Sequence, residues 1–283
     1  MTGTLLSIGH GYSAQALEPL LLPRGWTIIG TTRSTDKARA MTERGVTPLI
    51  WPGNPLPLAQ ATHLLTSVSP RDDDPVLAAH GANIARATHL RWVGYLSTIG
   101  VYGDQQGGWV DEDTIPNAAS ARAQARVQAE TAWQNACNTA GVRLHIFRLA
   151  GIYGTGRGPI AKLREGRAQR VVKPGQYFSR IHQADIGQAL DLAIHSDIGS
   201  RVYNLCDDQP APPQDVLAYA ARIAGLPVPP EVPFEDADLS PMARSFYADS
   251  KRVRNDRIKR ELGLKLLYPD YESGLRAILD AEG

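Results

Sequence analysis

TLLSIGHGYSA, residues 4–14, places a short apolar run directly before two closely spaced glycines and a small residue. The run has the length and composition of a β-strand, and residues 15–21, QALEPLL, have a helix-like composition. In such an order, Gly9 allows a tight turn, Gly11 lets the backbone approach a pyrophosphate, and Ala14 lets the helix pack closely on the strand. The helix amino terminus would add unpaired amides and a partial positive charge. The stretch therefore predicts a dinucleotide site, against the alternative of a plain strand-to-helix turn.

Short apolar runs alternate with helical patterns through the first half of the chain. We expect strands at residues 4–8, 26–32, 46–51, 63–68, 92–97 and 144–149. Helical composition falls between them, at residues 34–44, 74–87 and 118–140. The second of these helices has a start signal, with Asp74 as the cap and Pro75 at the first helical position. The alternation predicts an α/β fold, a Rossmann-type doubly wound parallel sheet that binds its ligand at the carboxyl ends of the strands.

The pattern changes after residue 154. Residues 155–159, TGRGP, are loop-like, and residues 210–241 are rich in proline around one expected helix, 214–224. This stretch is too irregular to continue the sheet and too apolar for a disordered linker. We therefore predict a Rossmann domain over residues 1–154, its sheet completed by residues 180–206, and a smaller carboxyl-terminal substrate lobe formed by residues 155–179 and 207–283.

Composition narrows the class of protein. The chain has 283 residues, 43% of them hydrophobic, and a net charge of +1, so nothing in its charge favours nucleic acid or an anionic membrane. The amino terminus lacks a basic leader, and no run of about eighteen apolar residues occurs. Cys137 and Cys206 lack metal-ligand or redox spacing, so we expect buried thiols and no metal site. These features predict a cytoplasmic protein with a small-molecule substrate, and they leave the oligomeric state open, a homodimer being one alternative.

The end of the second expected strand bears on which dinucleotide binds. An acidic residue at this place holds the ribose 2′-hydroxyl of NAD, whereas an arginine accommodates the 2′-phosphate of NADP. The chain has Thr32, Arg33 and Ser34 here, and no acidic residue before Asp36. Arg33 can pair with a phosphate while the two hydroxyls donate to it. The segment therefore favours NADP over NAD, against the alternative that Arg33 is a solvated loop cation and Ser34 only a helix cap.

Several later segments resemble one family in order and rough spacing. Residues 96–103, LSTIGVYG, residues 148–154, RLAGIYG, and residues 180–186, RIHQADI, resemble segments of the extended short-chain dehydrogenases. This is the superfamily of NAD(P)-dependent epimerases and dehydratases. Shorter matches follow at residues 203–205, 261–263, 268–269 and 274–275. The resemblance spans essentially the whole chain and implies a Rossmann-type fold with a bound nicotinamide cofactor.

The resemblance also implies site residues. The family uses a strand hydroxyl, matched by Thr98, and a tyrosine followed four residues later by a lysine that binds ribose. Anchoring on Ala129 and Glu130 places Arg122 at the tyrosine and Arg126 at the lysine. Arg126 can keep the ribose-binding role, but Arg122 has no acceptor lone pair and cannot act as an acid or base. Arg122 could hold a carboxylate or phosphate instead, or the two arginines could simply share a solvated helix face.

In lacking this tyrosine, the chain resembles the atypical short-chain dehydrogenases. Another residue would then have to act as the acid or base. His182 has a suitable intrinsic pKa, but beside an apolar neighbour it is more often a packing residue. Tyr102 and Tyr153 belong to segments that occur with or without chemistry. Tyr177 lies where the small lobe should meet the cofactor, so we predict it as the catalytic group beside Thr98. Nearby Arg180 could clamp an anionic substrate.

Two functions follow from these predictions. The first is an NADP-dependent oxidoreductase or epimerase-like enzyme acting on a small carbonyl, sugar or nucleotide-sugar. The second is a non-catalytic NADP-binding sensor or regulatory protein, in which Arg122 marks the loss of catalysis. For either, the predicted cofactor-binding residues are Gly9, Gly11, Tyr12, Ser13, Thr32, Arg33, Ser34, Val68, Ser69, Arg126, Leu149 and Gly151.

Overall fold

The strands expected from the apolar runs form one sheet in the computed structural model, which describes residues 2–282. Its strands are β1 (Thr4–Ile8), β2 (Thr27–Thr32), β3 (Thr47–Ile50), β4 (His63–Thr66), β5 (Trp92–Thr98), β7 (Arg143–Leu149) and β11 (Arg201–Leu205). They lie in the order β11-β7-β5-β4-β1-β2-β3, and each neighbouring pair is parallel. The chain therefore runs outward from β1 in both directions, and the predicted Rossmann-type fold is confirmed.

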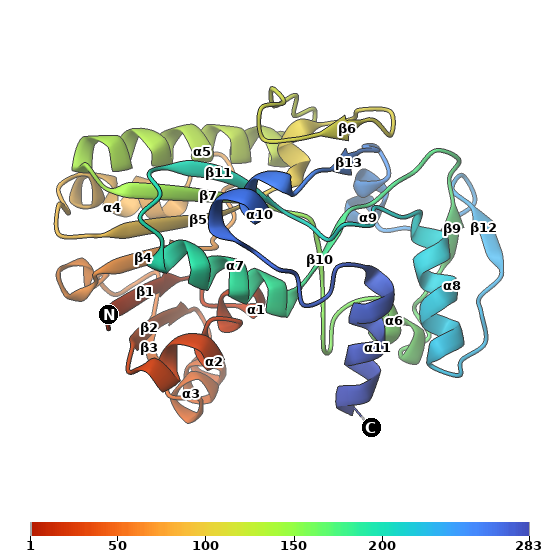
Figure 1. The fold of residues 1–283 in the computed structure, drawn as a ribbon, viewed down its shortest axis with the longest axis horizontal. Helices are drawn as coiled ribbons and strands as arrows, with labels where there is room; N and C mark the ends of the chain where they lie inside the picture. Colours follow the sequence, from red (N-terminus) through yellow and green to blue (C-terminus); the bar gives the residue numbers. More distant parts are fainter. Residues whose placement is uncertain (1, 283) are drawn as a thin grey trace.

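Helices cover both faces of this sheet (Figure 1). One face packs against α1 (Tyr12–Gln15), α2 (Glu18–Leu21), α3 (Thr35–Glu43), α7 (Gln183–His195) and α10 (Asp256–Leu262). The other packs against α4 (Pro75–Ala85) and α5 (Ala121–Ala140). The predicted start of α4 is confirmed, since Asp74 Oδ1 accepts from the amides of Val76 at 2.9 Å and Leu77 at 3.0 Å.

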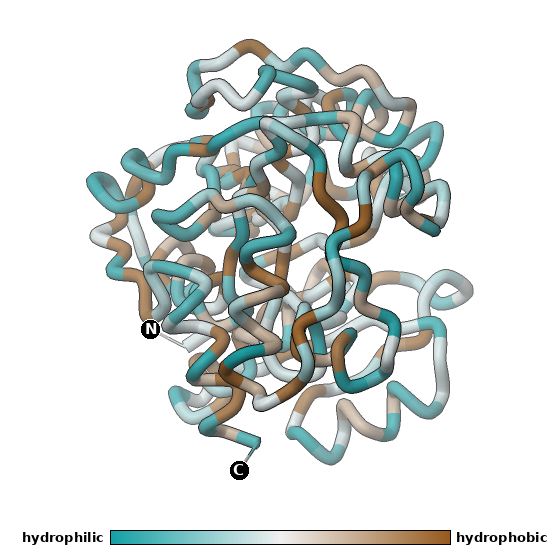
Figure 2. Tube along the Cα trace, turned by 90° about the vertical axis from the view of Figure 1, so that its right-hand side faces the viewer, coloured by the Kyte–Doolittle hydropathy of each residue, from teal (hydrophilic) through white to brown (hydrophobic). Residues whose placement is uncertain are grey.

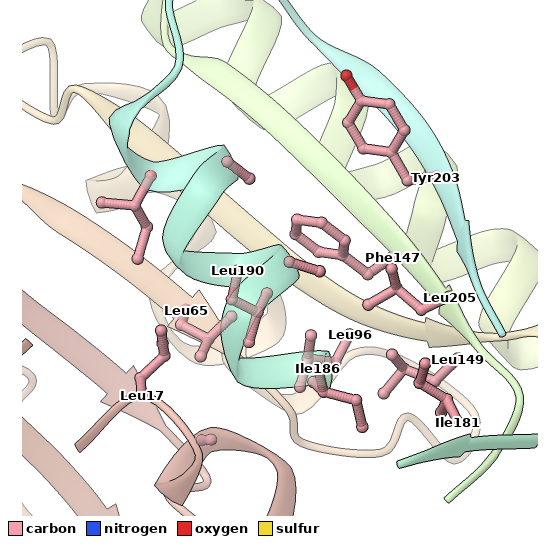
Figure 3. Close-up of a cluster of buried hydrophobic side chains, with 14 of the residues drawn as sticks. Leu17, Leu65, Leu96, Phe147, Leu149, Ile181, Ile186, Leu190, Tyr203 and Leu205 are labelled. Carbon is pink, nitrogen blue, oxygen red and sulfur yellow. The ribbon is translucent and has the colours of Figure 1, made fainter. Parts of the chain in front are cut away.

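The hydrophobic core lies between the sheet and these helices. In Figure 3, Ile186 and Leu190 of α7 point toward Leu65, Leu96 and Phe147 on the sheet, and all five side chains are buried. Full burial of one such side chain contributes about 1.5–3 kcal/mol. The core therefore holds α7, which the sequence pattern did not delimit, firmly on the nucleotide sheet.

The first helix differs from its prediction. A single helix over residues 15–21 is wrong, because the structure has two short ones, α1 and α2, with a break at Ala16 and Leu17. Pro19 lacks the amide that would continue α1, and it stands near the start of α2, where no such hydrogen bond is needed. The four-residue α1 thus carries fewer aligned peptide dipoles than a long helix would.

Smaller elements gather beyond the carboxyl ends of the strands. They are η3 (Ile99–Tyr102), β6 (Trp109–Val110), β8 (Gly151–Tyr153), α6 (Pro159–Arg164), β9 (Arg170–Val172), β10 (Arg180–His182), α8 (Pro213–Ile223), β12 (Glu231–Pro233), α9 (Pro241–Phe246), β13 (Arg252–Val253) and α11 (Tyr271–Glu282). Two short helices, η1 (Leu22–Arg24) and η2 (Leu58–Gln60), instead precede β2 and β4 at the amino ends of the strands. Figure 1 shows α6, α8, β9 and β12 on the right, beyond the carboxyl ends of the strands. The strands among them form two-stranded pairs β10-β8, β12-β9 and β13-β6.

This carboxyl-terminal region has hydrophobic clusters of its own. Tyr153, Val216 and Leu275 belong to one, and Val171 and Tyr247 to another. Figure 2 shows the apolar residues of the chain mainly on inner segments and the polar ones on outer turns. The exact division of the chain into two lobes stays a prediction. No helix among residues 2–282 is long and apolar enough to cross a membrane.

Candidate functional site

The glycine turn after β1 leaves its backbone open. Gly9 has φ +76°, a conformation that favours glycine, and its amide donates to Thr31 Oγ1 at 2.8 Å. Gly11 is exposed, and a Cβ built on it would meet only the Gly9 carbonyl oxygen, at 3.7 Å. Ala14 is buried, as expected of the small residue that lets the helix approach the strand. The space over Gly11 therefore fits a close-lying ligand group.

A buried polar chain supports this turn from behind. His10 Nδ1 lies 2.8 Å from Ser7 Oγ, and His10 Nε2 lies 2.9 Å from Glu18 Oε1. Arg44 donates to the same carboxylate through Nε at 2.7 Å. Burial alone would raise the pKa of Glu18, but the hydrogen bonds from His10 and Arg44 outweigh it and lower that pKa. The network fixes the residue between the two glycines, and it was not foreseen from the sequence.

The end of β2 presents an unpaired cation. Arg33 is exposed, and no side chain among residues 2–282 pairs with its guanidinium. Thr32 Oγ1 accepts from the Ser34 amide at 3.2 Å, and Ser34 Oγ accepts from the Lys37 amide at 3.3 Å as the cap of α3. The capping role proposed as the alternative for Ser34 is thus present. Both hydroxyls retain a proton to donate, so the segment keeps the chemistry that a phosphate needs.

Arg126 lies across the carboxyl ends of β4 and β5. Its NH1 donates to the Leu96 carbonyl at 2.7 Å and to the Tyr95 hydroxyl at 3.1 Å, and its NH2 donates to Ser69 Oγ at 2.8 Å. Burial raises the pKa of Tyr95 to about 12, so that hydroxyl keeps its proton. Val68, next to Ser69, touches the Gly9 position, where an added Cβ would lie 3.0 Å from Val68 Cγ2. Predicted residues that follow β1 and β4 thus come close to Arg126 of α5 here.

Thr98 and Arg122 have structural contacts of their own. Thr98, at the end of β5, is half-buried, and its Oγ1 accepts from the Gly100 amide at 3.1 Å. Its hydroxyl proton stays available for a ligand. Arg122 is exposed in the first turn of α5, and its guanidinium carbon lies 4.9 Å from the ring centroid of Phe246 in α9. This contact therefore joins α5, which packs on the central sheet, to α9 of the carboxyl-terminal region.

A buried network that the sequence pattern did not reveal underlies these strand ends. Arg148 donates to Glu130 through NH2 at 2.8 Å and to the Tyr102 hydroxyl through NH1 at 3.0 Å. Ser97 also donates to Glu130, at 2.5 Å, and Tyr102 donates to Asn204 Oδ1 at 2.7 Å. Burial raises the pKa of Tyr102 to about 12. These partners assign Tyr102 to structure, as the sequence analysis favoured.

The remaining acid or base candidates differ in their surroundings. Tyr177 is half-buried, its amide donates to Ser250 Oγ at 3.1 Å, and its ring stacks on Arg252 at 4.9 Å. His182 is buried, which lowers its pKa to about 4, and its Nδ1 accepts from the Ala184 amide at 3.2 Å. His182 is therefore a neutral packing residue near neutral pH. Burial has the opposite effect on the phenol of Tyr153, whose pKa it raises, so that hydroxyl keeps its proton. Tyr177 stays the predicted acid or base.

Leu149, Gly151 and Arg180 lie beside one another at the end of β7. Gly151 is exposed and pairs with Arg180 between β8 and β10, whereas Leu149 is buried. Arg180 NH1 donates to the carbonyl oxygens of Phe178 at 2.8 Å and Ala211 at 3.2 Å. Some of the N–H groups of Arg180 therefore hold backbone carbonyls. Its role in binding an anionic substrate stays a prediction.

A buried carboxyl near this region was missed in the sequence. Asp207 follows β11, is 1% exposed, and its Oδ2 has no partner among residues 2–282. Burial raises its pKa to about 8, although the nearby Arg180 acts in the opposite direction. No signal could have marked it, because its burial depends on strands distant in sequence. No cluster of metal-ligating side chains occurs in the described part of the chain.

A surface cavity of about 410 Å³ lies elsewhere, between η1, α7 and α10. It is lined by Arg24, Asp191, Leu192, His195, Ser196, Glu261 and Leu262. None of the predicted site residues lines it, so we do not assign the function to it.

Comparison with known proteins supports the fold. No protein-family model matches the chain. The human epimerase family protein SDR39U1 with NADPH superposes with a TM-score of 0.74 at 16% identity, over 98% of this chain and 99% of that one. UDP-glucuronic acid 4-epimerase from Bacillus cereus with NAD gives a TM-score of 0.77 at 16% identity, over 98% and 97% of the two chains. The protein thus has the Rossmann-type fold of NAD(P)-binding epimerases.

Two proteins are more similar in sequence. Protein YeeZ of Escherichia coli (strain K12) is 27% identical over 93% of this chain and 95% of its own length. A functionally unknown conserved protein from Silicibacter pomeroyi DSS is 56% identical, with a TM-score of 0.94 over 99% of both chains. The chain therefore belongs to the same family as the Silicibacter pomeroyi protein, and the function must be argued from the site.

Proposed function

We propose that the chain is an NADP-dependent oxidoreductase or epimerase-like enzyme that acts on a small carbonyl, sugar or nucleotide-sugar substrate. The observation that carries the proposal is the pairing of an open glycine turn at Gly11 with an unpaired Arg33 at the end of the adjacent strand. Such a pair suits the pyrophosphate and the 2′-phosphate of one dinucleotide. The similar structures with NADPH or NAD support the same cofactor class.

The residues that would hold NADP lie at the carboxyl ends of the strands. The glycine turn, including Tyr12 and Ser13, would hold the pyrophosphate, and Thr32, Arg33 and Ser34 the 2′-phosphate. Val68, Ser69 and Arg126 would hold the ribose near the nicotinamide, and Leu149 and Gly151 would border the ring. The cofactor supplies hydride transfer when bound.

The substrate would lie between these residues and the carboxyl-terminal region. Thr98 would donate its free hydroxyl proton to a substrate oxygen, and Arg122 and Arg180 would hold an anionic group. Tyr177 would act as the acid or base in place of the family tyrosine. Cytoplasmic location and a small-molecule partner remain part of the proposal.

One observation favours the second candidate, a non-catalytic NADP-binding sensor. Arg122 stands where the resemblance places the catalytic tyrosine, and its guanidinium stacks on Phe246 of α9. A guanidinium there has no acceptor lone pair for acid or base chemistry, and its contact with Phe246 would let an occupied cofactor site shift α9. The enzyme remains the preferred proposal because Thr98 keeps a proton for a substrate oxygen.

Turnover separates the two functions. The protein is incubated with NADPH and a panel of aldehydes, ketones and nucleotide-sugars, and oxidation is followed at the nicotinamide absorbance. Thr98→Ala should lower kcat by about 10-fold or more, because it removes a donor to the developing charge. Thr139→Ala, at a surface position of α5, serves as the control. NADPH binding without turnover, unchanged by Thr98→Ala, would instead support the sensor.

A further inference from the structure

The loop after β8 is fastened to the glycine turn through Tyr12. The Tyr12 hydroxyl donates to the Thr155 carbonyl at 3.2 Å, and the Gln183 side chain donates to the Tyr12 carbonyl. Gly154 lies so near that a Cβ built on it would stand 2.4 Å from the Tyr12 hydroxyl oxygen. Residues 154–158, named here the strap, therefore lie directly against the turn that is open at Gly11.

The backbone of the strap fixes the position of Arg157. Gly154 and Arg157 exchange two backbone hydrogen bonds, of 3.0 Å and 2.9 Å, so the strap closes as a tight hairpin. Gly156 at its tip has φ +68°, which a glycine adopts without strain. The Arg157 guanidinium carbon lies 5.3 Å from the centroid of the Tyr12 ring. A cation is thus held on the aromatic side chain of the glycine turn.

This cation has no acidic partner. Arg157 is exposed, and no carboxylate in the described part of the chain pairs with it. Burial raises the pKa of Tyr12, while the charge of Arg157 acts against that rise, so the two groups interact electrostatically. An unpaired guanidinium beside an open backbone turn suits a bound anion, since its fork matches phosphate oxygens.

Because helix α1 is short, the glycine turn offers a bound anion little positive charge of its own. A pyrophosphate carries about two negative charges, and a four-residue helix supplies little of the dipole that a long helix would provide. Another positive group is then needed to offset the charge of the ligand. Arg157 reaches the turn from a segment about 145 residues later in the sequence, and it does not depend on helix length.

We propose that Arg157 donates hydrogen bonds to the pyrophosphate of the bound dinucleotide, with the Tyr12 ring as its platform and the strap as its support. This inference rests on the proposed function, because it requires that the chain bind such a cofactor. The strap thereby becomes part of the cofactor site, although the sequence analysis placed it in the substrate lobe.

Isothermal titration with NADPH and with NADH tests the role, using Arg157→Met, Arg157→Lys and the control Arg167→Met. Methionine keeps an apolar stem but removes the charge, so both affinities should fall about 10-fold or more. Lysine keeps the charge but not the planar fork or its stacking on Tyr12, so its affinities should lie between those of the unaltered protein and of Arg157→Met. Arg167 is an exposed cation just beyond α6, and its replacement should change neither affinity. The melting temperature of the unliganded protein is measured for each variant.

The outcomes separate the inference from the proposed function. Binding by Arg157→Met equal to that of the unaltered protein would overturn the role of Arg157 alone. Equal losses for methionine and lysine, together with a lower melting temperature, would make Arg157 only a structural residue of the strap and would also overturn it. If the unaltered protein bound neither NADPH nor NADH, the proposed function itself would fail.

Discussion

Arg33 is the residue on which cofactor choice depends. It is exposed, unpaired among residues 2–282, and placed one residue after β2. A cation here suits the 2′-phosphate that distinguishes NADP from NAD. Its neighbours Thr32 and Ser34 retain hydroxyl protons although both already accept backbone hydrogen bonds.

Replacing Arg33 with alanine should weaken NADPH binding selectively. A charge-assisted hydrogen bond contributes about 1.5–3 kcal/mol, which corresponds to a loss of about 10-fold to 150-fold. NADH lacks the 2′-phosphate, so its affinity should hardly change. Arg39→Ala, at an exposed position of α3, is the matched control. Equal losses for both dinucleotides would remove the 2′-phosphate assignment.

At the scale of elements, buried polar side chains join strands to helices. The ion pair between Glu130 of α5 and Arg148 of β7 has both side chains 6% exposed. Removing one partner of such a pair leaves an uncompensated charge in the interior. The network therefore ties α5, which carries Arg122 and Arg126, to the strand ends that carry Thr98.

Glu130→Gln should destabilise the protein by about 3–5 kcal/mol, because Arg148 would remain buried and charged. Urea denaturation measures the loss of unfolding free energy. The double variant Glu130→Gln with Arg148→Met should be more stable than the single one, since the unpaired charge is gone. A single variant as stable as the unaltered protein would show that the ion pair does not hold these elements together.

Helices and strands could be predicted from the sequence where an apolar run or a capping signal extends over several consecutive residues. The six apolar runs form six strands of the sheet, and Asp74 with Pro75 starts α4 as expected. The pairs β10-β8, β12-β9 and β13-β6 escaped because each strand has only two or three residues and pairs with a distant segment. One helix was predicted over residues 15–21 where the structure has two, because the prediction took no account of Pro19.

The site could be predicted only in part for the same reason. Arg33 and the glycine turn are marked by residues adjacent in sequence, so local spacing was enough. Arg157 and Asp207 depend on tertiary contacts: one lies on Tyr12, about 145 residues away, and the other is buried by several elements. The resemblance to the extended short-chain dehydrogenases supplied Arg126, and the structure places it beside Ser69.

At the scale of the whole molecule, stability should depend on pH through buried histidines. His145 is fully buried, its Nδ1 accepts from Trp92 Nε1 at 3.0 Å, and its Nε2 lies 3.1 Å from the Gly199 carbonyl. Burial lowers its pKa from 6.5 to about 4. Between those values the unfolded chain binds a proton that the native protein does not, so this residue stabilises the fold less as the pH falls.

Denaturation at several pH values tests this dependence. Between pH 6.5 and 4, His145 should lower the unfolding free energy by up to about 1.4 kcal/mol per pH unit. His145→Gln cannot titrate, so its slope should be smaller by about that amount, whatever the offset in stability. Parallel slopes for the two proteins would contradict the assignment of a neutral buried His145.

The most direct test of the account is a titration of the unaltered protein with NADPH and with NADH, followed by calorimetry. The open turn at Gly11 and the unpaired Arg33 predict that both bind and that NADPH binds about 10-fold or more tightly, because only it carries the 2′-phosphate. Binding of neither dinucleotide would contradict the cofactor site, and tighter binding of NADH would contradict the choice of NADP.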